Sequence, residues 1–197
     1  AIPSAKYEGI NNLDEANKAL EKFKVPIVVK SDALAGGKGV TICNTKQDAF
    51  NDIKNILSGK FEKSKKVIIE EFLQGEEASY FVVTDGENYI PIGTAQDHKR
   101  IGENDTGLNT GGMGAYSPSF LISKEVDKKI KKTIIEPTIN AMKAKGCPYK
   151  GILYAGLMIN KSQPKLIEYN IRFGDPECQV LMMRLNNDLL EIIQSTL

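Results

Sequence analysis

The first 73 residues carry two kinds of hydrophobic spacing. Apolar residues three and four positions apart predict amphipathic helices that begin after the capping residues Asn12 and Thr45. Short apolar runs without this spacing predict strands. The predicted elements are helices at 12–23 and 45–57 and strands at 26–30, 40–43 and 67–73. Their order predicts a small α+β lobe over residues 1–73.

A second pattern begins after Gly75 and predicts a larger α+β lobe over residues 74–197. An Asp85-Gly86 pair between two apolar runs predicts a hairpin. Pro137 is expected to kink or restart a long helix. The predicted elements are strands at 78–84, 88–95, 151–160 and 165–173, a polar glycine-rich segment at 96–118, and helices at 124–145, from 176 and from 188.

The stretch from Lys165 to Glu177 combines a core-forming pattern with chemistry. Strand alternation predicts one apolar face, formed by Ile167, Tyr169, Ile171 and Phe173. The other face would carry Glu168, Asn170 and Arg172. After Gly174, the run Asp175-Pro176-Glu177 is typical of a helix start with Asp as the cap. Hard oxygens beside an Arg suit a divalent cation and the phosphates it bridges, although an exposed Glu168–Arg172 pair is the alternative.

Composition excludes several classes of function. A net charge of +1 gives no general attraction to nucleic acid or to acidic membranes, and no apolar run is long enough to span a membrane. The three cysteines lack metal-ligand spacing, which favours free thiols in a reducing compartment. We therefore expect a cytoplasmic protein with no nucleic-acid or membrane partner.

The loop Ala35-Gly-Gly-Lys-Gly39 lies between two predicted strands. The amides of Gly36, Gly37 and Gly39 and the charge of Lys38 suit an anion, although a plain hairpin loop is the alternative. The spacing is not that of a P-loop, because a strand and not a helix follows. Lys30 ends an apolar strand just before the loop, where a buried ammonium needs an anionic partner. Together these residues suggest a triphosphate.

Two further segments hold candidate binding residues. A carboxylate after an apolar strand, at 70–71, can recognise an adenine edge, although solvated acids are common at strand ends. The segment 96–118 is long for a loop in a compact domain, which favours a functional role. Its polar side chains and glycines are suited to wrapping a small phosphorylated substrate, whereas His98 by itself is more simply an exposed imidazole than a catalytic base.

Five motifs in order identify a family resemblance over residues 28–177. They are Val-Val-Lys-Ser-Asp-Ala-Leu-Ala-Gly-Gly-Lys-Gly-Val, Glu-Glu-Phe-Leu-Gln-Gly-Glu-Glu-Ala-Ser, Gln-Asp-His-Lys-Arg, Asn-Thr-Gly-Gly-Met-Gly-Ala-Tyr-Ser-Pro and Tyr-Asn-Ile-Arg-Phe-Gly-Asp-Pro-Glu. The chain resembles the ATP-grasp domain of the glycinamide ribonucleotide synthetase (phosphoribosylamine–glycine ligase) family. The resemblance implies an α+β ATP-grasp fold that holds ATP between two lobes.

The resemblance also implies roles for individual residues. Lys38 and Arg172 would act on the transferring phosphoryl group, and Glu168 and Asn170 would bind Mg²⁺, with Mn²⁺ as an alternative. The implied nucleotide-binding residues are Lys30, Gly36, Gly37, Lys38, Gly39, Glu70, Glu71, Phe72, Leu73, Glu77 and Asn109. The implied substrate-binding residues are Asp97, His98, Lys99, Arg100, Thr110, Gly111, Gly112 and Asp175. The strand at 153–159 carries no acid, so the ligands of a second metal ion are open.

Enzymes of this family phosphorylate glycine, and phosphoribosylamine then attacks the glycyl phosphate. The resemblance implies the same activity in purine biosynthesis, with glycine and phosphoribosylamine as substrates. Members are longer, with N- and C-terminal domains around this one, so we expect this piece to bind ATP but to ligate poorly alone. The alternatives are another ATP-grasp carboxylate–amine ligase and a nucleotide-binding module without chemistry.

Overall fold

The structure, a computed structural model, describes residues 1–33, 39–61, 66–98, 100–103, 106–110 and 112–197. It divides into two compact units. The smaller unit comprises Ala5–Leu73, and the larger unit comprises Ala1–Ser4 together with Gln74–Leu197. In the described part of the chain, every helix is too short or too polar to cross a membrane.

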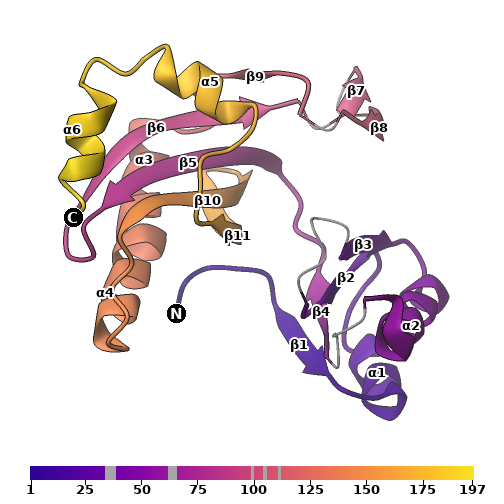
Figure 1. The fold of residues 1–197 in the computed structure, drawn as a ribbon. Coiled ribbons are helices and arrows are strands. Elements are labelled where there is room, and N and C mark those ends of the chain that lie inside the picture. Colours follow the sequence, from indigo (N-terminus) through magenta and orange to yellow (C-terminus); the bar gives the residue numbers. More distant parts are fainter. Residues whose placement is uncertain (34–38, 62–65, 99, 104–105, 111) are drawn as a thin grey trace. The chain divides into compact units, whose positions relative to one another are not determined.

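The smaller unit is a four-stranded antiparallel sheet with two helices packed on one face (Figure 1). Its elements are β1 (Tyr7–Ile10), α1 (Leu13–Leu20), β2 (Ile27–Ser31), β3 (Val40–Cys43), α2 (Lys46–Asn55), the π-helical turn η1 (Ile56–Lys60) and β4 (Val67–Glu71). The strand order is β1-β4-β2-β3. Inward-facing residues such as Ile27, Val29 and Ile69 are fully buried and pack with Ala16 and Ile53 of the helices.

Both predicted caps of the smaller unit are confirmed. The side chain of Asn12 accepts a bond from the Glu15 amide at 2.9 Å, and Thr45 accepts one from the Asp48 amide at 3.0 Å. These bonds satisfy backbone donors that have no partner inside the helix. The sequence did not predict β1, whose register on β4 begins with Tyr7 opposite Glu70.

The larger unit is built on a five-stranded antiparallel sheet in the order β11-β10-β5-β6-β9. Its strands are β5 (Glu76–Thr84), β6 (Tyr89–Asp97), β9 (Ala115–Tyr116), β10 (Gly151–Asn160) and β11 (Gln163–Asn170), with β7 (Arg100–Gly102) and β8 (Thr106–Asn109) forming a separate pair. Its helices are α3 (Lys124–Ile130), the π-helical turn η2 (Lys131–Ile135), α4 (Glu136–Ala144), α5 (Glu177–Met182) and α6 (Leu189–Gln194). The predicted loop at 96–118 therefore contains short strands.

The two faces of this sheet are covered differently. On one face, the alternate residues Tyr80, Val82 and Leu157 pack against α3, η2 and α4 in the main core (Figure 1). On the opposite face, Phe81 and Tyr154 form a smaller cluster with Leu181 of α5. This second face is only partly covered by α5, and it carries the candidate site.

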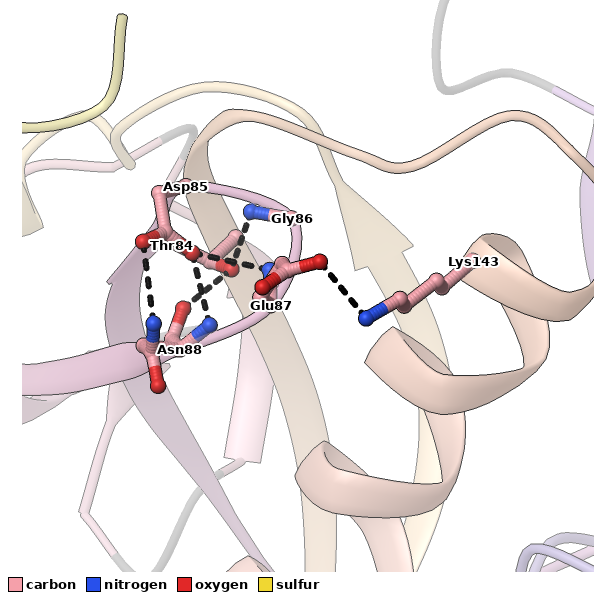
Figure 2. A network of polar contacts seen from close by, with 6 residues as sticks. All are labelled: Thr84, Asp85, Gly86, Glu87, Asn88 and Lys143. Atoms are coloured by element: carbon pink, nitrogen blue, oxygen red, sulfur yellow. Dashed lines mark hydrogen bonds and ion pairs between the residues drawn. The ribbon is translucent and has the colours of Figure 1, made fainter.

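The predicted hairpin turn between β5 and β6 is confirmed. The carboxylate of Asp85 accepts bonds from the amides of Glu87 at 2.8 Å and Asn88 at 2.6 Å, and Gly86 adopts φ +95° (Figure 2). These backbone bonds favour the ionised form and lower the pKa of Asp85 to about 2. Figure 2 also shows Lys143 of α4 reaching Glu87 at 2.6 Å, which ties the turn to that helix.

The predicted apolar face along 167–173 is wrong for Ile167 and Ile171, whereas Glu168 and Asn170 do share a side as predicted. A bulge in β11 leaves Ile167 without a partner, because Gly156 pairs with Glu168 while Leu157 pairs with Leu166. Ile167 therefore lies on the same side as Glu168, and β11 ends at Asn170. Ile171 is 76% exposed instead of buried.

The predicted start of α5 is also shifted. The helix begins at Glu177, and Pro176 occupies the cap position without a side-chain bond. Asp175, the expected cap, instead accepts a bond from the Gln179 side chain at 3.1 Å. The cap assignment for Asp175 is therefore wrong, although Glu177 does lie in the first turn.

Candidate active site

In the smaller unit, the candidate residues Lys30 and Glu70 meet on the sheet face opposite the helices. Lys30 Nζ lies 2.7 Å from a Glu70 carboxylate oxygen, and each side chain is 20% exposed. Alternation explains the placement, since the neighbouring residues Val29 and Ile69 point into the core. Lys30 is thus paired with a carboxylate of the chain, whereas the sequence suggested a triphosphate as its anionic partner.

The remaining candidates of the smaller unit lie at the end of β4 and beside the glycine loop. Glu71 accepts a bond from the Lys6 amide at 3.1 Å, and Phe72 is 37% exposed just after the strand. The carbonyl of Gly39 accepts a bond from the Ser31 amide at 2.8 Å. Gly36, Gly37 and Lys38 lie outside the described residues.

In the larger unit, a pocket opens on the partly covered face of the sheet. It is lined by Glu77, Ala78, Ser79, Asp97, Tyr154, Gly156, Leu157, Ile167 and Glu168, which come from β5, β6, β10 and β11. Three of these residues, Glu77, Asp97 and Glu168, are candidates from the sequence. Their carboxylates give the pocket an acidic lining that suits cations.

Glu168 stands beside Asn170 at the end of β11. The Asn170 amide nitrogen donates to Glu168 Oε1 at 3.1 Å, so the two side chains lie on the same side. A Cβ placed on Gly156 would lie 3.3 Å from Glu168 Cγ, so glycine leaves room for the carboxylate over β10. The second carboxylate oxygen and the amide oxygen are hard ligands of the kind that Mg²⁺ prefers. Within the described ranges, no group of three His, Cys, Asp or Glu residues is arranged to hold a metal ion.

Arg172 lies in the turn that follows β11. Its side chain is exposed and donates to the Phe173 carbonyl at 2.8 Å. The ring of Phe173 packs against the ring of Phe81 on β5, with ring centroids 6.5 Å apart. The guanidinium is therefore carried by a segment fixed to the sheet through its neighbour.

Several substrate candidates gather around a second turn. Thr110 donates to the His98 carbonyl at 2.6 Å and accepts from the Gly112 amide at 3.2 Å. Gly112 has φ +92°, and a Cβ there would lie 2.9 Å from the Asp175 carbonyl oxygen. The structure thus brings Thr110, Gly112 and Asp175 together. Lys99 and Gly111 lie outside the described residues, as do the side chains of Arg100 and Asn109.

A buried polar network joins two residues of the pocket lining, Ser79 and Tyr154, to Glu177 of α5. Glu177 Oε1 accepts bonds from Ser79 Oγ at 3.1 Å and from the Tyr154 hydroxyl at 3.0 Å, and these two hydroxyls are 2.9 Å apart. Burial of the phenol raises the pKa of Tyr154. Sequence reasoning missed all three residues as part of a site. Glu177 and Ser79 lie inside quoted motifs, whereas Tyr154 sits in an apolar run that gives no polar signal.

Comparison with known proteins identifies the fold class. The structure overlays on biotin carboxylase from Campylobacter jejuni with a TM-score of 0.76 at 19% identity, covering 99% of this chain and 42% of that one. It overlays on phosphoribosylamine–glycine ligase from Thermotoga maritima with a TM-score of 0.89 at 35% identity, covering 98% and 51%. The α+β architecture with two antiparallel sheets is therefore an ATP-grasp fold, as predicted.

The sequence comparison narrows the class to one family. The family model of the phosphoribosylglycinamide synthetase ATP-grasp (A) domain matches residues 1–178, and the chain belongs to that family. The chain is 53% identical over 194 residues to phosphoribosylamine–glycine ligase from Haemophilus influenzae. The aligned region covers 97% of this chain and 45% of the relative. The chain spans less than half of the length of the curated relatives that it matches.

Proposed function

We propose that this chain is the ATP-binding and phosphoryl-transfer part of a ligase that joins glycine to 5-phosphoribosylamine in purine biosynthesis. The family match and relatives named phosphoribosylamine–glycine ligase support this activity. The single observation that carries the chemistry is the placement of Glu168, beside Asn170, on the wall of a pocket in the larger unit.

The proposed reaction has two steps. A glycine carboxylate oxygen attacks the γ-phosphorus of ATP, the bond to the β,γ-bridging oxygen breaks, and ADP leaves with the electron pair. The amine of phosphoribosylamine then attacks the acyl carbon of glycyl phosphate, phosphate leaves, and the amine loses a proton to form the amide. Such chemistry needs charge neutralisation and alignment more than a protein nucleophile.

Residues of each unit, taken separately, have proposed roles toward the nucleotide. Lys30, Lys38 and the glycines 36, 37 and 39 would contact its phosphates, and residues 70–73 would line the adenine. Glu77 would bind the ribose, and Asn109 would lie near the phosphates. On nucleotide binding, the Lys30 ammonium would exchange part of its bond to Glu70 for the phosphate oxygens, which offer it a second anionic partner.

Glu168 and Asn170 would hold Mg²⁺, or Mn²⁺ in its place, because they present a carboxylate and an amide oxygen on one side of the strand end. The bound ion would neutralise charge on the β- and γ-phosphates. Arg172 would lie over the transferring phosphoryl group. Asp97, His98, Lys99, Arg100, Thr110, Gly111, Gly112 and Asp175 would enclose glycine and phosphoribosylamine.

The direct test of nucleotide binding is calorimetric titration of the chain with ATP, with and without Mg²⁺. We expect saturable binding that depends on Mg²⁺. The variant Lys30→Met should weaken it by about tenfold or more, because a charge-assisted contact to phosphate is lost. Absence of binding by the unaltered chain, confirmed as folded by circular dichroism, would contradict the proposal.

The substrate class needs a protein of the relatives' full length. A chimaera that carries this chain in place of the aligned 194 residues of the Haemophilus influenzae ligase would be assayed for ADP release with a panel of amino acids. Glycine-dependent release that requires phosphoribosylamine is expected. Release with another amino acid and not with glycine would favour a different carboxylate–amine ligase.

A further inference from the structure

Glu177 is an acidic side chain buried to 2% exposure. Within the described residues no Lys or Arg lies at ion-pair distance from it, and its partners are the hydroxyls of Ser79 and Tyr154. Burying a carboxylate is costly unless its oxygens accept hydrogen bonds. The two hydroxyls come from β5 and β10, so the network fixes the first turn of α5 to the centre of the sheet.

The same carboxylate packs against the turn that precedes α5. A Cβ placed on Gly174 would lie 2.3 Å from Glu177 Oε2 and 2.6 Å from its Cδ, so the turn backbone rests directly on the acid. The Gly174 carbonyl accepts a bond from the Cys178 amide at 3.0 Å, which closes the turn. The position of Gly174 is thus determined by where the Glu177 carboxylate is held.

Two candidate elements of the active site adjoin this turn. Arg172 lies two residues before Gly174, and its guanidinium is bonded to the Phe173 carbonyl. On the other side, Gly112 approaches Asp175 so closely that a Cβ on Gly112 would lie 2.9 Å from the Asp175 carbonyl oxygen. The turn therefore follows the arginine in the chain and, at Asp175, contacts the segment that contains Thr110.

From this arrangement we propose that Glu177 is a positioning residue: held by Ser79 and Tyr154, it sets the Gly174–Pro176 turn and, through it, Arg172 and the segment at Gly112. The inference rests on the proposed function, in which Arg172 contacts the terminal phosphate. Glu177 is not among the residues that line the pocket, and it acts through the turn. A side chain with this role affects alignment of the γ-phosphate more than general nucleotide binding.

The matched control for this network lies one residue away on β5. Tyr80 is 1% exposed, and its hydroxyl donates to Asp127 at 2.6 Å on the helix-covered face of the same sheet. Tyr154→Phe and Tyr80→Phe each delete one phenolic hydroxyl bonded to a carboxylate. Only Tyr154→Phe changes the face that carries the turn, so a difference between the two variants reports position and not general stability.

The experiment measures amide hydrogen exchange in the 197-residue chain and in Tyr154→Phe, Glu177→Gln and Tyr80→Phe. Exchange at Cys178 and Gly112, relative to amides within β5 and β10, is expected to rise about tenfold in the first two variants and to stay unchanged in Tyr80→Phe. If Glu177→Gln does not fold, the exchange rates in Tyr154→Phe alone decide whether the network positions the turn. Unchanged relative exchange at both amides would overturn the proposal.

The proposed effect of Glu177 on Arg172 is tested by the ratio of MgATP to MgADP affinity in the same variants. A fall of about tenfold in that ratio is expected for Tyr154→Phe and Glu177→Gln, since only ATP carries the phosphate assigned to Arg172. Equal losses for both nucleotides would overturn the positioning role and leave a structural contact. Failure of the unaltered chain to bind either nucleotide would contradict the proposed function, whereas the exchange result would still decide the role of Glu177 in the turn.

Discussion

Replacing Gly75 by alanine should destabilise the larger unit strongly. Gly75 has φ +147°, and a Cβ there would lie 2.4 Å from the Ile159 carbonyl oxygen and 2.9 Å from its carbon. Both atoms belong to the backbone at the end of β10, so no side-chain rotation relieves the contact. The left-handed backbone costs a residue with a Cβ about 1–2 kcal/mol, and the shift needed in a packed strand costs about 1–3 kcal/mol. We expect a total loss of about 2–5 kcal/mol.

A matched substitution at Gly146 separates the cost of the backbone conformation from the cost of the clash. It has φ +74° in the same unit, but a Cβ placed on it would meet nothing within 4 Å. Gly146→Ala should therefore lose only the backbone term of about 1–2 kcal/mol. The difference between the two variants measures the clash at Ile159.

Urea unfolding followed by near-UV circular dichroism provides the assay. The chain has seven tyrosines and no tryptophan, and Tyr7 is the only tyrosine in the smaller unit, so this signal reports the larger unit. Gly75→Ala should lower the urea midpoint clearly more than Gly146→Ala does. Equal midpoints for the two variants would refute the argument from the close approach to Ile159.

Three further outcomes are expected. Lys30→Met should lower the unfolding free energy of the smaller unit by about 1–2 kcal/mol, because it leaves the Glu70 carboxylate without its cation. In urea unfolding followed by far-UV circular dichroism, the double variant Lys30→Met with Glu70→Gln should recover part of that loss. No recovery would contradict the pairing of the two side chains. The Asp85 carboxyl should titrate near pH 2 by NMR, below the 3.8 of an unperturbed Asp. Its contribution to stability is therefore present above about pH 4 and is lost as the pH falls through 2. A midpoint near 3.8 would show that the turn bonds do not favour the anion. Phe81→Ala should cost about 3–5 kcal/mol, since its fully buried ring packs on Tyr154, and a loss below about 1 kcal/mol would contradict that packing.

Local signals in the sequence predicted much of the fold. Asn12 and Thr45 cap their helices through side-chain bonds to the backbone, and Asp85-Gly86 forms the expected hairpin turn. In each case the interaction lies within three residues, so composition at that point decides the conformation. The strand β1 was missed because Tyr-Glu-Gly-Ile lacks a clear alternation, and its stability comes from pairing with β4 about sixty residues later.

The faces of β11 could not be predicted for a related reason. The period of two holds only while each residue has a partner, and the bulge at Ile167 shifts the later residues by one. Nothing in the local sequence marks that insertion. The strand then ends at Asn170, so Ile171 and Arg172 follow the path of a turn and not the alternation of a strand.

Some residues of the candidate site could be predicted from local motifs, and others could not. Glu168, Asn170 and Glu77 were predicted from motifs, and the structure places Glu77 and Glu168 on one pocket and Asn170 beside Glu168. Tyr154 was not predicted, because its role depends on a hydroxyl that meets Glu177 across two elements. Side chains that support a site through long-range contacts carry no spacing signal in one sequence.

The proposed metal site is tested most directly by asking whether Glu168 makes nucleotide binding depend on a metal ion. Calorimetric titration with ATP would compare the unaltered chain with Glu168→Gln and with Glu125→Gln, an acid 71% exposed in its side chain and paired with Lys129 on α3. We expect Glu168→Gln to abolish the Mg²⁺-dependent part of ATP binding and Glu125→Gln to leave it intact. Unchanged Mg²⁺-dependent affinity in Glu168→Gln would contradict the role of Glu168 as a metal ligand.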